Sequence, residues 1–447
     1  MISKRANAIA SLATPALSFA TLAIALGLGA HGETIAALVY GAPPGIDRQG
    51  LAWQVEVMLE DRGVREVKPG KAISTSATWK GTTQNWSGVT STDGAAEMTF
   101  NFPGIAPGDE LDLDVRAADG VSLARSRAHV PPARARGSIS RGALPALRRD
   151  GAIGLDVAIL GGGLAAEFPS ELWVHARDQD GHSISAARIH FNTVDGLTFG
   201  NTEVSTCSDG WAKVFVTASA LNAEGTITAK SGAFSGSWTG ALPIVLGSTR
   251  AIVNQDDAGN LHADVARPLV TPSNAYVEID DGAGRLFATT VPLVPTGNDF
   301  ARAVIDLPKL ADGTYWIVSS SEPRAAETMA PGAFAVPFRV GKNATDPCPG
   351  DGELATMHAG GFARSIVADG FTDARIIASR RRKQGISITF AALALGALVE
   401  TLLILRAAKS GANVKASWMI GTAGTVAVGV GLSLLGFALL AAFVATH

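Results

Sequence analysis

The feature that most constrains the fold is a series of short runs in which apolar and polar residues alternate. These runs recur between about residues 51 and 340, with Gly, Asp or Pro between them, as at 51–59, 171–177 and 276–280. Alternation with a period of two is the pattern of a strand that buries one face. Strands at such close spacing are typical of sandwiches or barrels rather than of βαβ units. The chain is therefore predicted to be mainly β.

An internal repeat indicates more than one sandwich. Asp93-Gly94 and Asp209-Gly210 each precede a strand pattern, and Asp312-Gly313 has a comparable place further on. Asp-Gly supplies the positive φ that a tight hairpin turn requires. We predict tandem sandwiches at residues 36–132, 153–245 and 246–342. A basic linker rich in Pro and Arg is predicted at 133–152, and a juxtamembrane segment at 343–384.

Three tryptophans lie in the middle of strand patterns. Trp53, Trp173 and Trp316 are each flanked by alternating apolar residues. Because such a strand buries one face, all three are predicted to be core residues.

The middle unit carries a resemblance to a known family. The residues concerned are those at 172–184, 189–191, 208–214 and 225–229. They resemble the bacterial Ig-like repeats of invasin-type proteins and are similar to the macroglobulin-like domains of bacterial alpha-macroglobulins. The resemblance implies Ig-like sandwiches in extracytoplasmic, adhesive or spacer roles, without catalytic residues. The thioester motif Gly-Cys-Gly-Glu-Gln is absent around both cysteines, so protease trapping is not implied.

Long apolar runs lie on both sides of the β region. Residues 6–32 and 418–444 contain no Asp, Glu, Lys or Arg, and 385–405 contains only Glu400. About 20 apolar residues suffice to span a bilayer. We predict a signal-anchor helix within 1–35, a second span at 385–405 and a third within 417–447. A cleaved signal peptide is the alternative for the first run, although the apolar part of such a peptide is only about 7–15 residues long.

Positive charges predict the orientation of these spans. They flank the first run and fill the short loop at 406–416, as Lys4, Arg5, Arg406, Lys409 and Lys415. Positive charge in short loops favours the cytoplasm. We therefore expect a multi-pass protein of the bacterial inner membrane, with the β region periplasmic or extracellular. The basic run at 380–383 opposes this orientation unless its side chains snorkel to lipid head groups. Residues 354–377 would then form a broken amphipathic helix on the membrane surface.

Several motifs have both a chemical and a structural interpretation. The glycines at 161–163 could open a dinucleotide site, but Pro169 leaves no room for the helix that such a site needs. Acidic turns at 178–181, 256–260 and 280–282 could be parts of calcium loops, although turn chemistry alone explains them. Zinc would require three histidines of one hairpin region to converge, namely His175, His182 and His190. Neither a cofactor nor a metal is predicted.

The two cysteines lie in different predicted units. Cys207 belongs to the middle unit and Cys348 to the juxtamembrane segment. An oxidising compartment would permit a bridge between them. Two free thiols are the favoured interpretation, and the bridge is the alternative.

Interaction candidates are basic residues, one acid inside a span and a stripe of small residues. Basic linkers bind anionic polysaccharide or lipid head groups, or merely stay solvated. An acid inside a span faces a partner or snorkels, and small residues spaced four apart let helices pack closely. The candidates are Arg134, Arg136, Arg141, Arg380, Arg381, Arg382, Lys383, Glu400, Gly421, Thr425, Gly429 and Ser433.

Charge and motifs together predict a class of function. A net charge of −3 gives no basic footprint for nucleic acid. We find no nucleophile–base pair, metal set or phosphate loop in the sequence, and no small-molecule substrate is indicated. The prediction is a non-enzymatic, membrane-anchored envelope protein. Its Ig-like domains would serve as a scaffold or protein–protein interaction subunit of a membrane complex, with the lipid bilayer and other envelope proteins as partners. The alternatives are an accessory subunit of a transporter or membrane enzyme that uses Glu400, or a surface adhesin that binds glycan.

Overall fold

The computed structural model describes part of the chain. The described residues are 33–47, 50–61, 63–132, 142–192, 194–220, 222–247, 249–256, 258–268, 273–297, 300–324, 333–341, 354, 364–377, 379–380, 383–384 and 387. Contacts divide the chain into two compact units. One holds Ile35–Glu60 and Arg65–Phe371, and the other holds Met1–Thr34, Asp61–Val64 and Thr372–His447. The first unit contains nearly all the described strands.

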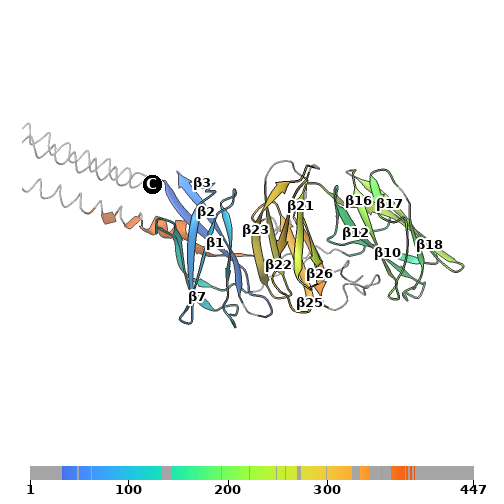
Figure 1. Cartoon of the computed structure of the whole chain (residues 1–447), viewed down its shortest axis with the longest axis horizontal. Helices are drawn as coiled ribbons and strands as arrows, with labels where there is room; N and C mark the ends of the chain where they lie inside the picture. Colours follow the sequence, from blue (N-terminus) through green and yellow to red (C-terminus); the bar gives the residue numbers. More distant parts are fainter. Residues whose placement is uncertain are drawn as a thin grey trace, which may run out of the picture. The chain divides into compact units, whose positions relative to one another are not determined.

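Sandwich 1 is built from two sheets at the start of the β region (Figure 1). One sheet has the order β27-β1-β2-β3, with β6 also paired to β2, and the other has the order β5-β4-β7-β8. Its core includes the fully buried Trp53, Met98 and Phe100. The strands are β1 (Thr34–Gly41), β2 (Leu51–Asp61), β3 (Val64–Val67), β4 (Ala72–Trp79), β5 (Thr82–Val89), β6 (Ala95–Phe100), β7 (Glu110–Ala117), β8 (Ser122–His129) and β27 (Ser365–Asp369).

Sandwich 2 repeats this arrangement. Its main sheets have the orders β10-β12-β16-β14 and β15-β13-β17-β18-β9, and β11 pairs with β19. Trp238 and Phe191 are fully buried in its core. The first strand, β9, lies in the stretch predicted as linker and pairs with β18. The strands are β9 (Arg148–Gly151), β10 (Gly154–Ile159), β11 (Leu164–Ala165), β12 (Pro169–Arg177), β13 (Arg188–Phe191), β14 (Leu197–Phe199), β15 (Glu203–Ser205), β16 (Trp211–Ala218), β17 (Ala223–Ser231), β18 (Phe234–Leu242) and β19 (Ile244–Val245).

Sandwich 3 is one continuous path of strands, β20-β21-β24-β23-β22-β25-β26. The long strand β23 links its two halves, because most of β23 pairs with β22 while Val294 and Pro295 pair with β24. The strands are β20 (Arg250–Gln255), β21 (Leu261–Arg267), β22 (Ser273–Asp280), β23 (Arg285–Pro295), β24 (Ala301–Asp306), β25 (Gly313–Ser320) and β26 (Phe334–Val340). The prediction of a mainly β chain with sandwich-like sheets is confirmed.

The Asp-Gly repeat has the same geometry in sandwiches 1 and 2. Gly94 and Gly210 have φ of +69° and +80°, and each precedes a strand, β6 or β16. Both glycine N–H groups donate to a carbonyl three residues earlier. The third Asp-Gly differs, because Gly313 begins β25 itself.

The three predicted core tryptophans have different surroundings. Trp53 is fully buried in sandwich 1. Trp173 is buried outside the main core of sandwich 2, edge-on to Trp211, in a cluster that also includes residues of sandwich 3. Trp316 is only half-buried beside a small cluster of Val318 and Ala335, so its prediction as a core residue is wrong. It lies on the face of β25 opposite Tyr315 and Ile317, which fill the main core of sandwich 3.

The segment before the second apolar run differs from its prediction. Residues 365–369 form β27, which pairs antiparallel with β1 from Leu38↔Asp369 to Gly41↔Ser365. Among the described residues, α-helical conformation begins at residue 370. The predicted helix over 354–377 is therefore wrong at 365–369, because these residues complete a sheet instead. The antiparallel register places the start of β1 and the end of β27 at the same end of sandwich 1.

Apart from Ser387, the apolar runs predicted to span the membrane, 6–32, 385–405 and 418–444, lie outside the described residues. Within the described part of the chain, no helix is both long and apolar enough to cross a bilayer.

Candidate functional sites

Four charged side chains meet where sandwich 1 contacts sandwich 3, and we call them the charged junction. They are Glu97 on β6, Glu278 on β22, Arg285 on β23 and Arg364 just before β27. Arg285 Nη1 lies 2.9 Å from Glu97 Oε2, and Arg285 Nε lies 2.8 Å from Glu278 Oε2. Arg364 binds the same Glu278 oxygen. Every one of these side chains is at most 3% exposed.

The neighbouring carboxylates of the junction stabilise Arg285 in its charged form. Burial alone would lower the pKa of Arg285, but the carboxylates of Glu97 and Glu278 outweigh this and raise its pKa. Its Nη1 also donates to the carbonyl of Ala52. Charges removed from water need both pairing and hydrogen bonds to be tolerated. The junction therefore joins β6, two strands of sandwich 3 and the segment that returns to β27.

Further polar contacts surround the junction. Arg324 donates to Glu56 at 2.9 Å, and its guanidinium lies 4.5 Å from the centre of the Tyr40 ring. Gln54 donates to Glu97 at 2.7 Å and to the carbonyl of Pro323. These groups enclose the charged pairs with partners from both sandwiches.

A tyrosine extends this contact surface to the repeated turn of sandwich 1. The Tyr276 hydroxyl on β22 donates to Asp93 at 2.8 Å and lies 2.6 Å from the Ser91 hydroxyl. Burial is the main cause that raises the pKa of Tyr276, and the nearby Asp93 charge adds to it. The first Asp-Gly turn therefore contributes side chains to the contact with sandwich 3.

The contact between sandwiches 2 and 3 is mainly apolar. Phe168 and Phe300 lie 5.0 Å apart between ring centres, and Trp173 belongs to the same cluster. Arg250 is the buried cation here, donating to the Pro169 carbonyl and to the Ser170 hydroxyl. Burial lowers the pKa of Arg250 to about 10. Sandwich 3 thus has one charged and one apolar contact surface within the same compact unit.

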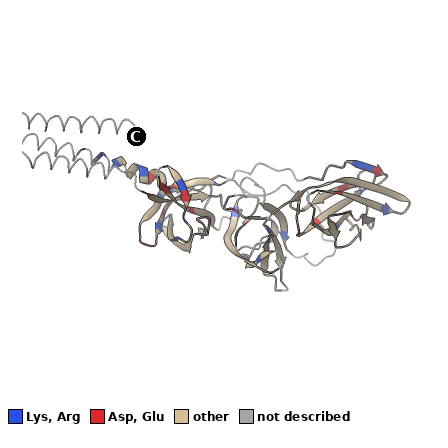
Figure 2. Ribbon diagram, turned by 90° about the horizontal axis from the view of Figure 1, so that it is seen from above, with Lys and Arg blue, Asp and Glu red and all other residues tan. Residues whose placement is uncertain are grey.

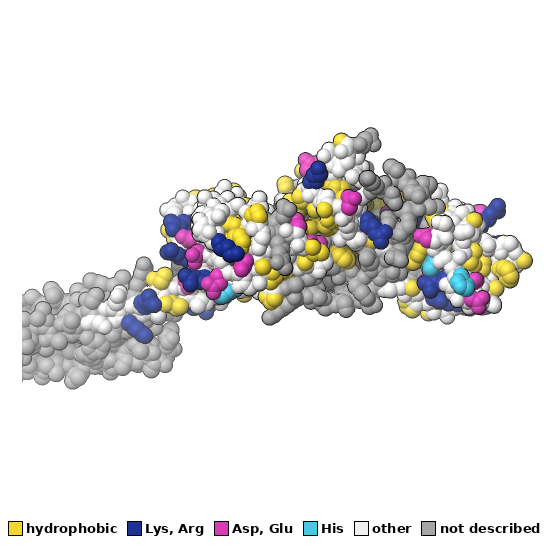
Figure 3. Space-filling model, turned by 90° about the horizontal axis from the view of Figure 1, so that it is seen from below, with side chains coloured by type: hydrophobic (Ala, Val, Ile, Leu, Met, Phe, Trp, Pro, Cys, Tyr) yellow, Lys and Arg dark blue, Asp and Glu magenta, His cyan; other side chains and the backbone are white. Residues whose placement is uncertain are grey.

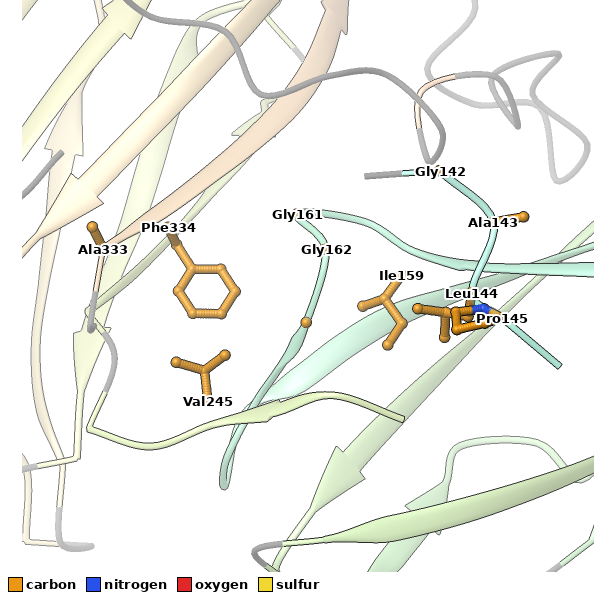
Figure 4. Close-up of a pocket in the computed structure, with 11 residues that line it drawn as sticks. Gly142, Ala143, Leu144, Pro145, Ile159, Gly161, Gly162, Val245, Ala333 and Phe334 are labelled. Carbon is orange, nitrogen blue, oxygen red and sulfur yellow. The ribbon is translucent and has the colours of Figure 1, made fainter. Parts of the chain in front are cut away.

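A cavity of about 350 Å³ lies beside this apolar surface (Figure 4). Its lining includes Gly161, Gly162, Ile159, Val245 and Phe334, and no lining residue of the described chain has a titratable side chain. The glycines form a turn between β10 and β11 with φ of +82° and +81°. The turn interpretation of the glycine motif is confirmed, because a strand rather than a helix follows.

The three candidate histidines do not converge. His175 is buried on β12, whereas His182 and His190 are exposed on a turn and on β13. The His175 ring stacks on Trp211 at 4.6 Å, and its Nδ1 accepts from Arg177. Burial, followed by the Arg177 charge, lowers the pKa of His175. Its environment therefore favours the neutral form, and the ring is a packing group on Trp211.

The acidic turns are explained by their own backbone hydrogen bonds. Asp178 Oδ1 accepts from the N–H groups of Asp180 and His182 at 2.9 and 2.8 Å. Side-chain ligand atoms of these three residues lie within 4.8 Å of one another, largely exposed. Asp256 and Asp281 likewise accept backbone N–H groups of their own turns. The turn interpretation therefore accounts for the acidic residues.

One cysteine corrects the sequence prediction. Cys207 is disulfide-bonded, so the expectation of two free thiols is wrong. The only other cysteine of the sequence, Cys348, lies outside the described residues. The cause is tertiary, because the distance between two units cannot be deduced from spacing.

Of the predicted interaction residues, the structure describes Arg380 and Lys383, and both are exposed. Charged residues are scattered along the ribbon (Figure 2). Figure 3 shows hydrophobic side chains interspersed with polar and charged ones. The remaining candidates lie outside the described residues, namely Arg134, Arg136, Arg141, Arg381, Arg382, Glu400, Gly421, Thr425, Gly429 and Ser433.

The charged junction was not predicted. Its carboxylates occupy polar positions of alternating strands, which normally face solvent. A signal was nevertheless present, because Gln54 and Glu56 of β2 and Glu278 of β22 lie among apolar neighbours on both sides. Only contact between two sandwiches could convert these positions into buried ones.

Comparison with known proteins gives likenesses at the level of solved structures only. No family model matches the chain, and no curated protein matches it. The D0-D1 domain of intimin is 14% identical with a TM-score of 0.15, and the match covers 46% of this chain and 99% of the intimin chain. A tetra-tandem repeat from the extending region of a large adhesion protein is 14% identical with a TM-score of 0.18, and the match covers 70% of this chain and 76% of the adhesion-protein chain.

A third likeness is to trypsin-activated alpha-2-macroglobulin from Escherichia coli. It is 10% identical with a TM-score of 0.17, covering 72% of this chain and 24% of the macroglobulin. The chain thus spans about a quarter of that protein. At TM-scores this low, none of the three likenesses carries an argument about function.

Proposed function

We propose that the chain is a non-enzymatic, membrane-anchored envelope protein whose Ig-like sandwiches form a scaffold close to the bilayer, as a subunit of a membrane complex. The apolar runs at 6–32, 385–405 and 418–444 would be the anchors. Basic residues near them favour an extracytoplasmic position for the sandwiches.

The observation that carries this proposal is the pairing of β1 with β27. β1 follows the first apolar run and β27 precedes the second, and their antiparallel register brings these two connections to one end of sandwich 1. A domain tethered twice at one end stays near the bilayer. Such an arrangement suits a subunit better than a long-reach adhesin.

The contacts of sandwich 3 also support a scaffold. Its charged junction to sandwich 1 and its apolar contact with sandwich 2 bury specific side chains on both sides. Arg364 adds the returning segment to the charged junction. Partners would therefore meet sandwiches whose contacts with one another are already formed.

Cleavage in the linker tests the double anchorage. A site for a specific protease is inserted after Pro132, and membranes carrying the full chain are cut and then washed with alkaline carbonate in denaturing urea, which separates β1 from β27. If both ends are anchored, both fragments stay in the membrane pellet. An uncut sample and a version truncated before residue 33 are the controls.

Release of the N-terminal fragment into the carbonate wash would contradict the double anchorage, because it would mean that the first apolar run is removed. Release of both fragments would overturn membrane anchorage itself.

A further inference from the structure

Strand β5 is an unusual edge strand. It lies at the end of the order β5-β4-β7-β8 and pairs with β4 through eight consecutive residue pairs without a bulge. None of its residues is buried. Ordering a residue costs about 1–2 kcal/mol of backbone entropy, and burial normally offsets this cost. Trp86 is half-buried and packs against the core of sandwich 1, but no residue of β5 is fully buried. The eight-residue strand is therefore longer than this one contact requires.

Edge strands are normally protected against pairing with other chains. Charges, proline, bulges and short length are the usual means. Among the described strands at sheet ends, nine carry a charged residue or proline, and β11, β14 and β19 have only two or three residues. The nine are β3, β6, β8, β9, β10, β15, β20, β26 and β27. β5 has the sequence Thr-Thr-Gln-Asn-Trp-Ser-Gly-Val, with neither charge nor proline.

The repeat within the chain shows that this length is not a property of the fold. In sandwich 2 the corresponding order is β15-β13-β17-β18, so that β15 has the place of β5. β15 has three residues and includes Glu203. The same sheet position is therefore short and charged in one sandwich, but long and neutral in the other.

Among the described strands, none pairs with the outer edge of β5, so its backbone presents a regular row of outward hydrogen-bonding positions. The Thr90 N–H donates to the Lys71 carbonyl, which marks a hydrogen-bonded pair beside the end of β5. Such pairs alternate along an antiparallel ladder. The N–H and C=O groups that point away from β4 therefore belong to Thr83, Asn85, Ser87 and Val89.

We infer that β5 is a docking edge for β5 of a second copy of this chain, so that two four-stranded sheets join into one. Strand addition at an exposed edge gains main-chain hydrogen bonds along the added strand. Self-pairing of β5 places no like charges opposite each other, in whichever direction the strands run. A partner selected by charge would find no charged residue on β5 to bind.

The argument for a second copy rests on the proposed membrane anchorage. Copies confined to one bilayer meet at a raised effective concentration, so that a contact of a single strand suffices. The contact would make the scaffold a dimer.

Cysteine cross-linking in native membranes tests the inference. Asn85→Cys and Ser87→Cys are expressed in the full chain, singly and together. Both side chains lie on the exposed face of β5. Directly opposite Cβ atoms in paired strands are about 4.5–5.5 Å apart, close enough for a disulfide after slight adjustment. When two β5 strands pair antiparallel with Asn85 at the centre, Asn85 of one copy lies opposite Asn85 of the other. With Trp86 at the centre, Asn85 lies opposite Ser87. With Ser87 at the centre, the two Ser87 residues lie opposite each other.

A matched control lies one strand away. Ser76 on β4 is the cross-strand partner of Asn85. Strands are about 4.8 Å apart, so two Ser76 positions in the joined sheet would be about 14 Å apart, too far for a disulfide. We expect a mild oxidant to convert most of at least one β5 combination into dimer, and Ser76→Cys to give no more dimer than the parent chain.

Blocking variants distinguish strand pairing from side-chain contact. Ser87→Pro removes an outward N–H while the bonds to β4 remain, and should reduce Asn85→Cys cross-linking at least tenfold. Ser87→Ala keeps the N–H and should leave Asn85→Cys cross-linking unchanged. The inference would be overturned if the β5 cysteines gave no more cross-linked dimer than Ser76→Cys. It would also be overturned if Ser87→Pro and Ser87→Ala reduced cross-linking equally. Sedimentation of the same sample tests anchorage separately, since a soluble protein would refute the proposed function whatever the cross-linking result.

Discussion

Arg285 on β23 and Glu97 on β6 form a 2.9 Å ion pair in which each side chain is 3% exposed. The two residues belong to different sandwiches, and Glu278 binds the other side of the same guanidinium. Desolvation of buried charges costs several kcal/mol per ion, which pairing only roughly offsets. We therefore expect the pair to contribute mainly by specifying which surfaces of sandwiches 1 and 3 meet.

Breaking this pair should be strongly destabilising. Arg285→Met leaves two carboxylates buried without their shared cation, which typically costs about 3–5 kcal/mol. Urea unfolding of the purified protein measures the change. Arg127→Met is the control, because its pair with Asp112 is exposed on both sides and should be worth at most about 1 kcal/mol. Equal, small effects of both substitutions would mean that the junction does not hold the sandwiches.

His175 should make stability depend on pH. Its pKa is lowered by burial and by Arg177, with Asp156 and Asp209 acting in the opposite direction. The unfolded chain therefore binds a proton more readily, and the stability from this site falls as pH drops below about 6.5. His175→Gln should lose less stability than the wild type between pH 7.5 and pH 5. The exposed His190→Gln is the control and should follow the wild type.

The loss of stability when a tryptophan is truncated to alanine should follow how deeply that tryptophan is buried. Trp53→Ala empties a fully buried site and removes a hydrogen bond to the Ala42 carbonyl, so it should cost about 3–5 kcal/mol. Trp316→Ala should cost clearly less, since that ring is half-buried and lies outside the main core of sandwich 3. Thermal unfolding compares the two variants, and a larger loss for Trp316→Ala would refute this assignment of the cores.

The disulfide of Cys207 should link sandwich 2 to the returning segment. Since the sequence has one other cysteine, peptide mapping without reductant should find Cys207 joined to Cys348. Cys207→Ser should lower stability by about 2–4 kcal/mol, the usual worth of a native bridge. Full reactivity of both thiols in the unreduced, denatured protein would exclude the bridge.

Local features were predictable from the sequence and long-range ones were not. The turns at Gly94 and Gly210 follow from adjacent residues, and so does the burial of Trp53 within an alternating strand. Which face of β25 meets the core is decided by the whole sheet, which is why Trp316 was misassigned. Likewise, residues 365–369 became a strand because β1 provides an edge far away in the sequence. The charged junction needed two sandwiches in contact before Glu97 could be buried.

Site-directed labelling of single cysteines tests the central claim, that the sandwiches lie outside the cytoplasm. Ala233 is exposed at the tip of the β17–β18 hairpin, and Ser410 lies in the predicted cytoplasmic loop. In intact spheroplasts an impermeant maleimide should modify Ala233→Cys and leave Ser410→Cys unmodified until the membrane is opened, with the parent chain as background. Labelling of Ser410→Cys but not of Ala233→Cys in intact spheroplasts would contradict the proposed orientation, and with it the extracytoplasmic scaffold.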